Sequence, residues 1–298
     1  MKTEQQEQAL EFFRRFASDW RRRAEGGELW KVNVIRQRNE YVLEVVRRKG
    51  DVRRFLDVGC GSGELVCDVA ALGASAEGVD FAPEMVELGR NLAQQRKLES
   101  ARFACASVFD YEPEGRPLDL IAANGFIEYF SRSELLELLS RMRSWLAPGG
   151  SLVVGSRNRL FNLFSLNDYS RLERRSGALE PLLGEAIEIA GAETWANALD
   201  ALRRCKALLP EVGSHPITGV EVATRHQYTP AELVARCENA NFEVVELRPI
   251  HYHAAPPGFA RRHPEIHVAT AELFQENAAG EPALLPFSSS FMVHAVAR

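Results

Sequence analysis

The chain has 298 residues and a formal net charge of −5, and 46% of its residues are hydrophobic. These values are typical of a globular protein with an apolar core, and they exclude collagen-like and globally disordered chains. The acidic balance argues against a nucleic-acid partner, because phosphates attract a basic surface. No apolar run approaches the roughly 20 residues that span a bilayer, and the N-terminus lacks the pattern of a signal peptide. We therefore expect no membrane span and a cytoplasmic location.

The first 50 residues predict helices. Apolar residues recur at helical spacing over 3–24 and again over about 29–49, and Gly50 ends the second pattern. Residues 1–50 are expected either to form a cap or lid over a ligand pocket or to pack the aromatic stripe of the first helix on the core.

Residues 51–155 alternate between short apolar runs and amphipathic segments. The apolar runs predict strands over 54–58, 76–80, 101–106, 118–123 and 151–155. The segments between them predict helices. This alternation predicts an α/β fold with a parallel sheet and helices on both faces, and these residues should form the cofactor-binding core.

Residues 156–228 break the regular pattern and are predicted to form an insertion, with helices near 178–190 and 193–208. We expect this insertion to cap the substrate. Its aromatic side chains predict either the wall of an aromatic pocket or a small satellite core, and they are Phe161, Phe164, Tyr169 and Trp195.

Residues 229–298 are predicted to complete the core sheet. Thr229 is placed to cap a helix, and strands are predicted over 241–247 and 291–297. The long connection 248–290 joins these two strands and holds four of the seven histidines.

Those four histidines raise the question of a metal site. His251 and His253 share one face of a strand end, and His263 and His267 share one face of a helix. No carboxylate completes a ligand set at a tight spacing, and none of the five cysteines has Cys-x-x-Cys spacing. We therefore expect free thiols and no metal, with the connection folding over the acceptor site as part of a lid.

A glycine loop follows the first predicted strand. Gly59, Gly61 and Gly63 let the backbone approach a ligand at a helix N-terminus. Asp80 ends the second predicted strand, where a carboxylate accepts hydrogen bonds from ribose hydroxyls. A dinucleotide fingerprint requires glycine where this chain has Glu64, and the carboxylate of Asp57 is a poor neighbour for a pyrophosphate. The loop suits a nucleoside cofactor with a cationic part.

The segment 56–90, LDVGCGSGELVCDVAALGASAEGVDFAPEMVELGR, resembles the opening motifs of class I S-adenosylmethionine-dependent methyltransferases. The resemblance implies a Rossmann-like, doubly wound sheet of seven strands, the last antiparallel, with a mainly helical cap. It also implies S-adenosylmethionine as the cofactor. The residues it assigns to cofactor binding are Asp57, Gly59, Cys60, Gly61, Gly63, Asp80, Phe81, Met85, Ser107, Val108 and Asn124.

The family also implies roles for these positions. Asp57 corresponds to a carboxylate near the methionine ammonium, and Asp80 to the ribose ligand. Phe81 and Met85 are expected beside the adenine. Ser107 stands where the family often has an acid.

A narrower resemblance, to the ubiquinone-biosynthesis O-methyltransferases, extends outside this core. It rests on segments 33–36, 126–130, 156–159 and 225–233. It implies that Arg36 helps to hold the cofactor carboxylate, a task that suits a guanidinium fork. The chain departs from that family in having Glu128-Tyr129 where Glu-His is usual, and in the length of the connection 248–290.

Three residues are candidates for the acceptor side. His226 is the first choice for a general base, since a phenolic acceptor with a pKa near 10 benefits from one; a surface or hydrogen-bonding role is the alternative. Tyr129 and Glu128 follow the fourth predicted strand, near the expected transfer point, and are expected either to contact substrate or to start and pack a helix.

Together these features predict methyl transfer to a small-molecule acceptor, with oxygen of an aromatic or lipophilic metabolite as the first choice. N-methylation of a small amine, an RNA methyltransferase and a non-catalytic cofactor-binding scaffold are the alternatives. The sequence leaves the oligomeric state open.

Overall fold

The structure is a computed structural model that describes residues 11, 32–115, 117–205, 209–210, 226–277 and 280–298. The first predicted helix, over 3–24, lies outside these residues apart from Glu11.

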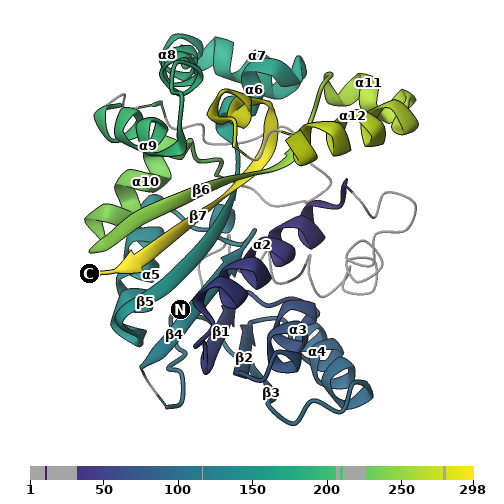
Figure 1. Cartoon of the computed structure of the whole chain (residues 1–298), viewed down its shortest axis with the longest axis vertical. Coiled ribbons are helices and arrows are strands. Elements are labelled where there is room, and N and C mark those ends of the chain that lie inside the picture. The colour runs from purple at the N-terminus through teal and green to yellow at the C-terminus, as the bar shows by residue number, and fades with distance from the viewer. Residues whose placement is uncertain (1–10, 12–31, 116, 206–208, 211–225, 278–279) are drawn as a thin grey trace.

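Seven strands form one sheet in the order β3-β2-β1-β4-β5-β7-β6 (Figure 1). Strands β1 to β5 run parallel to one another, whereas β7 runs antiparallel to both β5 and β6. The prediction of a doubly wound seven-stranded sheet with an antiparallel last strand is confirmed. The strands are β1 (Arg54–Val58), β2 (Ser75–Asp80), β3 (Ala101–Cys105), β4 (Leu118–Asn124), β5 (Leu146–Arg157), β6 (Phe242–Tyr252) and β7 (Ser288–Ala297).

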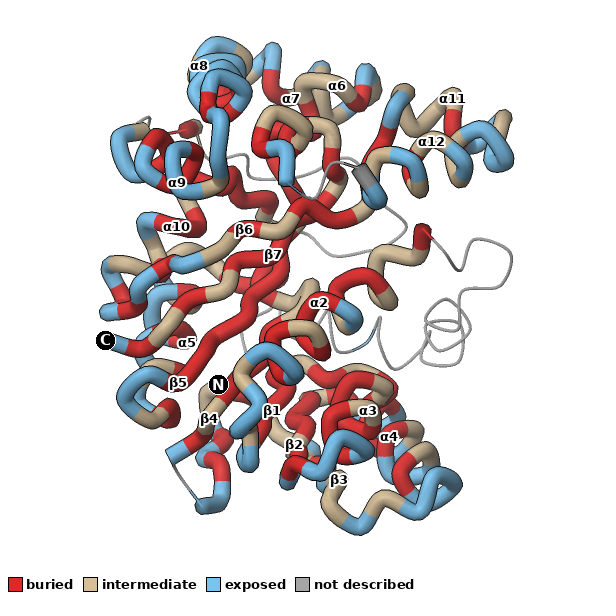
Figure 2. Tube along the Cα trace, in the orientation of Figure 1, coloured by how far each residue is buried: buried red, intermediate tan, exposed pale blue. Residues whose placement is uncertain are grey.

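Helices cover both faces of this sheet. One buried apolar cluster joins the sheet to α2 (Val34–Lys49), α3 (Glu64–Ala71) and α4 (Pro83–Gln95). A second cluster joins the opposite face to α5 (Arg132–Trp145) and α10 (Pro230–Asn239). Successive residues of a strand point to opposite faces, and the buried strands between the two helical layers run through the centre of the molecule (Figure 2).

Local capping explains where several helices begin. Asn33 accepts hydrogen bonds from the amides of Ile35 and Arg36 at the start of α2. Ser131 and Glu134 form a reciprocal capping box at α5, and Thr229 caps α10 as predicted. These side chains satisfy amides that would otherwise lack partners in the first turn of each helix.

Strand β6 is longer than predicted. The sequence pattern predicts that it ends at residue 247. In the structure β6 continues to Tyr252, and Pro249 pairs in register with Phe291 of β7. The difference has a simple reason: β6 is an edge strand that pairs with β7 alone, so an edge proline is tolerated. The connection to β7 is correspondingly shorter than 248–290.

The insertion after β5 and the connection after β6 are mainly helical, as predicted, and they gather at one end of the sheet (Figure 1). The helices predicted near 178–190 and 193–208 correspond to α8 and α9. The helices of the two segments are α6 (Asn162–Ser165), α7 (Asp168–Ser176), α8 (Leu179–Ala190), α9 (Trp195–Arg204), α11 (Pro257–Arg262) and α12 (Pro264–Asn277). No helix among the described residues is long and apolar enough to cross a membrane.

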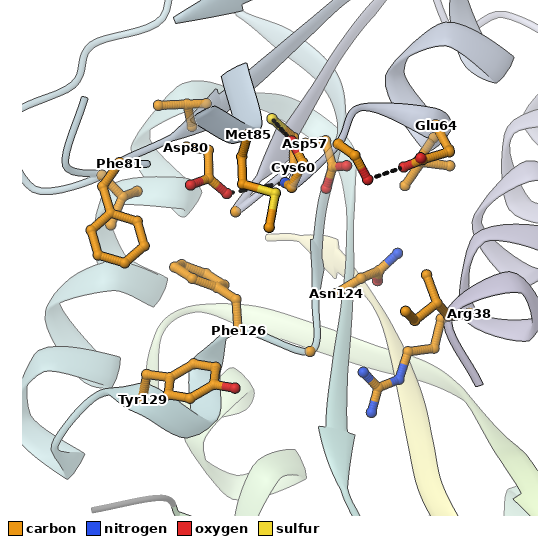
Figure 3. Close-up of a pocket in the computed structure, with 18 of the residues that line it drawn as sticks. Arg38, Asp57, Cys60, Glu64, Asp80, Phe81, Met85, Asn124, Phe126 and Tyr129 are labelled. Carbon is orange, nitrogen blue, oxygen red and sulfur yellow. Dashed lines mark hydrogen bonds between the residues drawn. The ribbon is translucent and has the colours of Figure 1, made fainter. Parts of the chain in front are cut away.

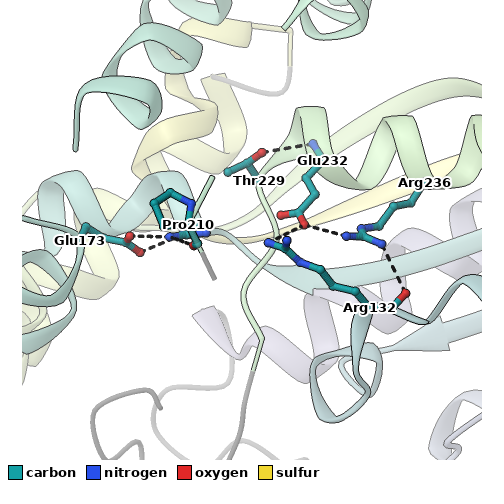
Figure 4. A network of polar contacts seen from close by, with 7 residues as sticks. Arg132, Glu173, Pro210, Thr229, Glu232 and Arg236 are labelled. Carbon is teal, nitrogen blue, oxygen red and sulfur yellow. Dashed lines mark hydrogen bonds and ion pairs between the residues drawn. The ribbon is translucent and has the colours of Figure 1, made fainter. Parts of the chain in front are cut away.

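A buried ion pair within the insertion joins the segment just after β5 to α7 (Figure 4). Arg159 donates from Nε to Glu173 Oε1 at 3.0 Å and from Nη2 to Glu173 Oε2 at 2.8 Å. Arg159 Nη2 also donates to the carbonyl of Pro210 at 3.1 Å. Both charged side chains are almost completely buried. A paired charge therefore stabilises the insertion internally, in addition to apolar packing.

Candidate active site

A pocket opens at the carboxyl ends of β1, β2 and β4 (Figure 3). Ligands of open α/β sheets bind at this edge. Most of the predicted cofactor-binding residues line the pocket, namely Asp57, Gly59, Cys60, Gly61, Asp80, Phe81, Met85, Ser107, Val108 and Asn124. Gly63 lies beside them as the N-cap of α3. The structure therefore brings most of these predicted residues together around one cavity.

The glycine loop is held tightly against the sheet. Gly63 has a φ of +83°, a conformation that L side chains rarely adopt, and a Cβ there would lie 2.5 Å from the ring of Phe103. Gly59 donates from its amide to the carbonyl of Val79 at 2.8 Å. The loop thus needs glycine to turn into α3 at this point.

Asp80 is fixed by backbone amides on both of its carboxylate oxygens. Oδ2 accepts from the amide of Gly61 at 3.0 Å, and Oδ1 accepts from the amide of Ala82 at 2.9 Å. Burial raises the pKa of the Asp80 carboxyl, and the hydrogen bonds from backbone amides oppose that rise. A carboxylate oxygen accepts more than one hydrogen bond. Asp80 therefore keeps acceptor capacity for a ligand's hydroxyls in a fixed orientation.

Asp57 has a buried carboxyl group, one oxygen of which has no hydrogen-bond partner among the described residues. Its side chain is 4% exposed, and Oδ1 has no hydrogen-bond partner among the described residues. Burial, followed by the negative charges of Asp80 and Glu64, raises the pKa of the Asp57 carboxyl well above its usual range. A buried carboxylate is costly unless a cation or hydrogen-bond donors accompany it. The three carboxylates therefore favour a cationic ligand and oppose a pyrophosphate (Figure 3).

Arg38, which the sequence analysis missed, lines the pocket where Arg36 was expected. Arg36 lies outside the lining and pairs with Glu40 at 2.6 Å. Arg38 is buried, and its Nε donates to Ser290 of β7 at 3.2 Å. Two residues along an α-helix differ by about 200° in direction, so 36 and 38 face opposite sides. The signal was the apolar face of α2, which Arg38 shares with Tyr41 and Val45.

Aromatic side chains form the other wall of the pocket. Phe126 and Phe130 lie edge to face with ring centroids 4.8 Å apart, and Tyr129 lies between them in the chain, in the short helix η2 (Ile127–Tyr129). Phe81 and Met85 project into the same cavity from the β2 side (Figure 3). The pocket therefore joins an acidic floor to an apolar, aromatic side.

Of the three candidate acceptor residues, only Tyr129 lines the pocket, and the other two lie next to it in the structure. Tyr129 lines the pocket, whereas Glu128 is buried and does not. The amide of His226 donates to the carbonyl of Glu128 at 2.8 Å, so the segment that carries His226 lies directly against η2. His226 is not among the described residues that line the pocket. Its neighbour Arg225, which belonged to the narrower resemblance, lies outside the described residues.

The aromatic residues of the insertion do not reach this cavity. Phe164 stacks near Phe287 with ring centroids 4.4 Å apart, and Phe161 packs near His253 at 4.7 Å. Trp195 packs against the large apolar cluster. The described contacts favour the satellite core over the aromatic pocket.

Comparison with known proteins bears directly on this site. Residues 55–150 match the model of a methyltransferase domain family. The chain is a class I S-adenosylmethionine-dependent methyltransferase. It is 24% identical over 242 residues to the ubiquinone biosynthesis O-methyltransferase of Coxiella burnetii. The alignment covers 81% of this chain and 84% of that relative.

Solved structures share the fold of this methyltransferase at low identity. The magnesium protoporphyrin IX methyltransferase of Synechocystis PCC 6803, with bound SAH, aligns with a TM-score of 0.59 and 14% identity, covering 97% of each chain. A S-adenosylmethionine-dependent methyltransferase from Methanosarcina mazei aligns with a TM-score of 0.53 and 16% identity, covering 85% of this chain and 96% of that one.

The pocket fits S-adenosylmethionine, the cofactor of this methyltransferase. That molecule carries an ammonium and a sulfonium cation, a carboxylate, a ribose and an adenine. The unsatisfied carboxylate of Asp57 matches a cation, and the fixed carboxylate of Asp80 matches the ribose hydroxyls. Arg38 is the buried guanidinium of the lining and matches the carboxylate.

Proposed function

We propose that this enzyme transfers the methyl group of S-adenosylmethionine to an oxygen of a small aromatic or lipophilic molecule. The observation that carries the proposal is the aromatic wall formed by Phe126, Tyr129 and Phe130, just past the end of β4. Apolar and aromatic linings with few polar groups are typical of small-molecule sites. The similarity to an O-methyltransferase of ubiquinone biosynthesis supports oxygen as the acceptor atom.

On this proposal the cofactor supplies a methyl group that is already activated by its sulfonium. The protein's task is to align the acceptor and to exclude water. Asp57 binds the ammonium, Asp80 the ribose hydroxyls and Arg38 the carboxylate, while the loop from Gly59 to Gly63 lies along the methionine part. Phe81 and Met85 flank the adenine, with Ser107 and Val108 beside it, and the backbone of Asn124 faces the methyl group.

Three residues then act on the acceptor, and a fourth positions one of them. The ring of Phe126 stacks against the acceptor, and the Tyr129 hydroxyl orients its oxygen. A hydroxyl acceptor must lose a proton during transfer, and His226 receives it as general base. Glu128 positions that segment through its backbone carbonyl, which accepts from the His226 amide.

The experiment is a transfer assay with labelled S-adenosylmethionine against a panel of phenols, catechols, aliphatic alcohols, small amines and bulk RNA. Mass spectrometry of the product identifies the methylated atom. The proposal predicts label on oxygen of an aromatic or lipophilic compound. Label on an amine nitrogen or on RNA, with none on oxygen, contradicts it.

The role of His226 is tested within the same assay. His226→Gln is expected to lower kcat by a factor of about 100, the usual contribution of a general base, and to shift the pH profile of kcat, while S-adenosylmethionine affinity stays unchanged. A variant with an unaltered pH profile contradicts the assignment. His263→Gln, which changes a partly exposed histidine of the same chain, is the matched control.

A further inference from the structure

Three histidine side chains meet near the end of β6. One ring nitrogen from each of His251, His253 and His267 lies within 4.8 Å of the other two. The Nε2 atoms of His251 and His267 are 3.4 Å apart. Two ligands at about 2.0–2.1 Å from a tetrahedral zinc ion lie about 3.4 Å from each other. These two nitrogens are therefore already at the spacing of metal ligands.

The chain brings the three rings together from two elements. His251 lies in β6 and His253 directly follows it, while α12 supplies His267. His251 has a φ of +59°, a left-handed conformation that a non-glycine residue rarely adopts. Its amide donates to Gln37 Oε1 of α2 at 2.8 Å. Backbone strain of this kind persists where the surroundings enforce it, commonly at functional sites.

A serine fixes the orientation of the first ring. Ser289 Oγ donates to the carbonyl of His251 at 3.3 Å and lies 2.8 Å from His251 Nδ1. With its proton directed at that carbonyl, the hydroxyl accepts the Nδ1 proton of the imidazole. The lone pair of His251 then resides on Nε2, which is the atom that faces His267. Metal-binding histidines usually donate their second ring N–H to such a partner.

The three histidine side chains are buried or partly buried. Burial lowers the pKa of each, to about 3 for His253, and the neighbouring histidines lower the pKa of His251 further. His253 is 7% exposed, and its Nδ1 is buried without a hydrogen-bond partner among the described residues. Ordinary packing leaves this polar atom unexplained.

The cluster also lies on the side of the sheet where the chemistry takes place. Strand β6 is antiparallel to β7, which is antiparallel to β5, so β6 ends at the same edge as β4 and β5. Ser289 holds His251, and its neighbour Ser290 holds the pocket residue Arg38. Three strand spacings of about 4.8 Å separate the end of β6 from that of β4.

We propose that His251, His253 and His267 together bind one divalent transition-metal ion, with zinc as the best match, and leave a coordination position open to water or a small ligand. Imidazole suits zinc and its neighbours in the first transition series, whereas calcium and magnesium require oxygen ligands. A set of three histidines with a fourth position free is the arrangement found in catalytic zinc sites. The proposal replaces the sequence-based expectation of no metal, and it does not depend on the identity of the methyl acceptor.

The experiment measures metal binding by the full chain, purified without a histidine tag and stripped with a chelator. Zinc titrated by calorimetry is expected to bind at one equivalent, and cobalt is expected to give the visible absorption of tetrahedral coordination. His267→Gln should weaken zinc binding at least tenfold. Ser289→Ala, which keeps all three ligands, should weaken it by a factor of about ten. His263→Gln, on the same segment but outside the cluster, should bind like the wild type.

Several outcomes overturn the proposal. One is wild-type protein that takes up no zinc, and another is equal affinity in the wild type and His267→Gln. A sulfur-to-cobalt charge-transfer band is a third, because it assigns the metal to cysteine. Retained S-adenosylmethionine binding and an unchanged circular dichroism spectrum show that each variant is folded, so that a loss of zinc reports on the ligands.

Discussion

The carboxylate of Asp80 accepts a hydrogen bond from the amide of Gly61 at 3.0 Å, which ties the acid at the end of β2 to the glycine loop after β1. The sequence separates these residues by 19 positions, and the parallel pairing of β1 with β2 brings them together. Loop and acid therefore act as one unit, and a change in either should disturb the other.

Asp57 should lower the unfolding free energy of the protein and increase its affinity for the cofactor. The pKa of its buried carboxyl is raised above the ordinary aspartate value, so the native state binds the proton more tightly than the unfolded state does. Its contribution to stability therefore falls as pH rises from the ordinary pKa to the raised one. At pH 7–8 Asp57→Asn should raise the unfolding free energy by about 1–3 kcal/mol, measured by urea denaturation without cofactor.

The same variant distinguishes two possible partners of the Asp57 carboxylate, the ammonium and the sulfonium of the cofactor. If Asp57 binds the ammonium, Asp57→Asn weakens S-adenosylmethionine and S-adenosylhomocysteine equally, by a factor of about ten or more. Calorimetry with both ligands gives the ratio. A loss confined to S-adenosylmethionine would place the carboxylate at the sulfonium instead.

Gly125 should be needed for the position of Arg38. Its φ is +68°, and a Cβ there would lie 2.1 Å from Arg38 Nη1, so Gly125→Ala must displace the guanidinium. Cofactor affinity should fall about tenfold, in addition to a backbone cost of about 1 kcal/mol. Gly149→Ala is the matched control, since its φ is +73° with nothing within 4 Å. Equal cofactor affinity in the two variants would refute this role of Arg38.

The buried pair of Arg159 and Glu173 should be essential to the stability of the insertion (Figure 4). Glu173→Gln leaves Arg159 charged and buried, and removing one partner of such a pair costs about 3–5 kcal/mol. Asp168→Asn, which breaks the exposed pair with Arg171 on the same helix, should cost less than about 1 kcal/mol. Urea denaturation measures both variants, and similar losses would contradict the buried-charge explanation.

Glu185 should make stability depend on pH. Burial raises the pKa of its carboxyl to about 7, against the hydrogen bond from the Ala231 amide that lowers it. Stability is therefore lost as pH rises from about 4.5 to about 7, by up to about 3 kcal/mol. Glu185→Gln should remove most of this dependence, whereas the exposed Glu188→Gln on the same helix should keep it. Denaturation curves of both variants at pH 5 and pH 8 measure how much their stability depends on pH.

Local signals carried most of the fold and the cofactor half of the site. Short segments of sequence determine the strands, the capping residues and the loop from Gly59 to Gly63. Periodicity and spacing within those segments therefore predict them. The choice between Arg36 and Arg38 depends on which face of α2 is buried, and β6 extends through Pro249 only because it lies at an edge. The buried face of α2 and the edge position of β6 both depend on how the whole sheet is assembled, so a short segment of sequence does not reveal them.

The meeting of three histidines lay beyond the sequence for the same reason. The sequence pattern placed His251 with His253 on one face of a strand end, and His263 with His267 on one face of a helix. In the structure His267 turns to the strand-end residues His251 and His253 instead, and His263 lies apart. Tertiary packing of α12 on β6 decides this arrangement, and no local pattern encodes it.

Calorimetric titration of S-adenosylmethionine into the wild type, Asp80→Ala and Asp68→Asn tests the central claim most directly. Asp80→Ala removes the ribose acceptor and the hydrogen bond from the Gly61 amide that ties the glycine loop to β2, so its affinity should fall at least tenfold. Asp68→Asn changes a partly exposed acid of α3 that pairs with Arg96, and it should bind like the wild type. Unchanged affinity in Asp80→Ala would contradict the assignment of this pocket to the cofactor.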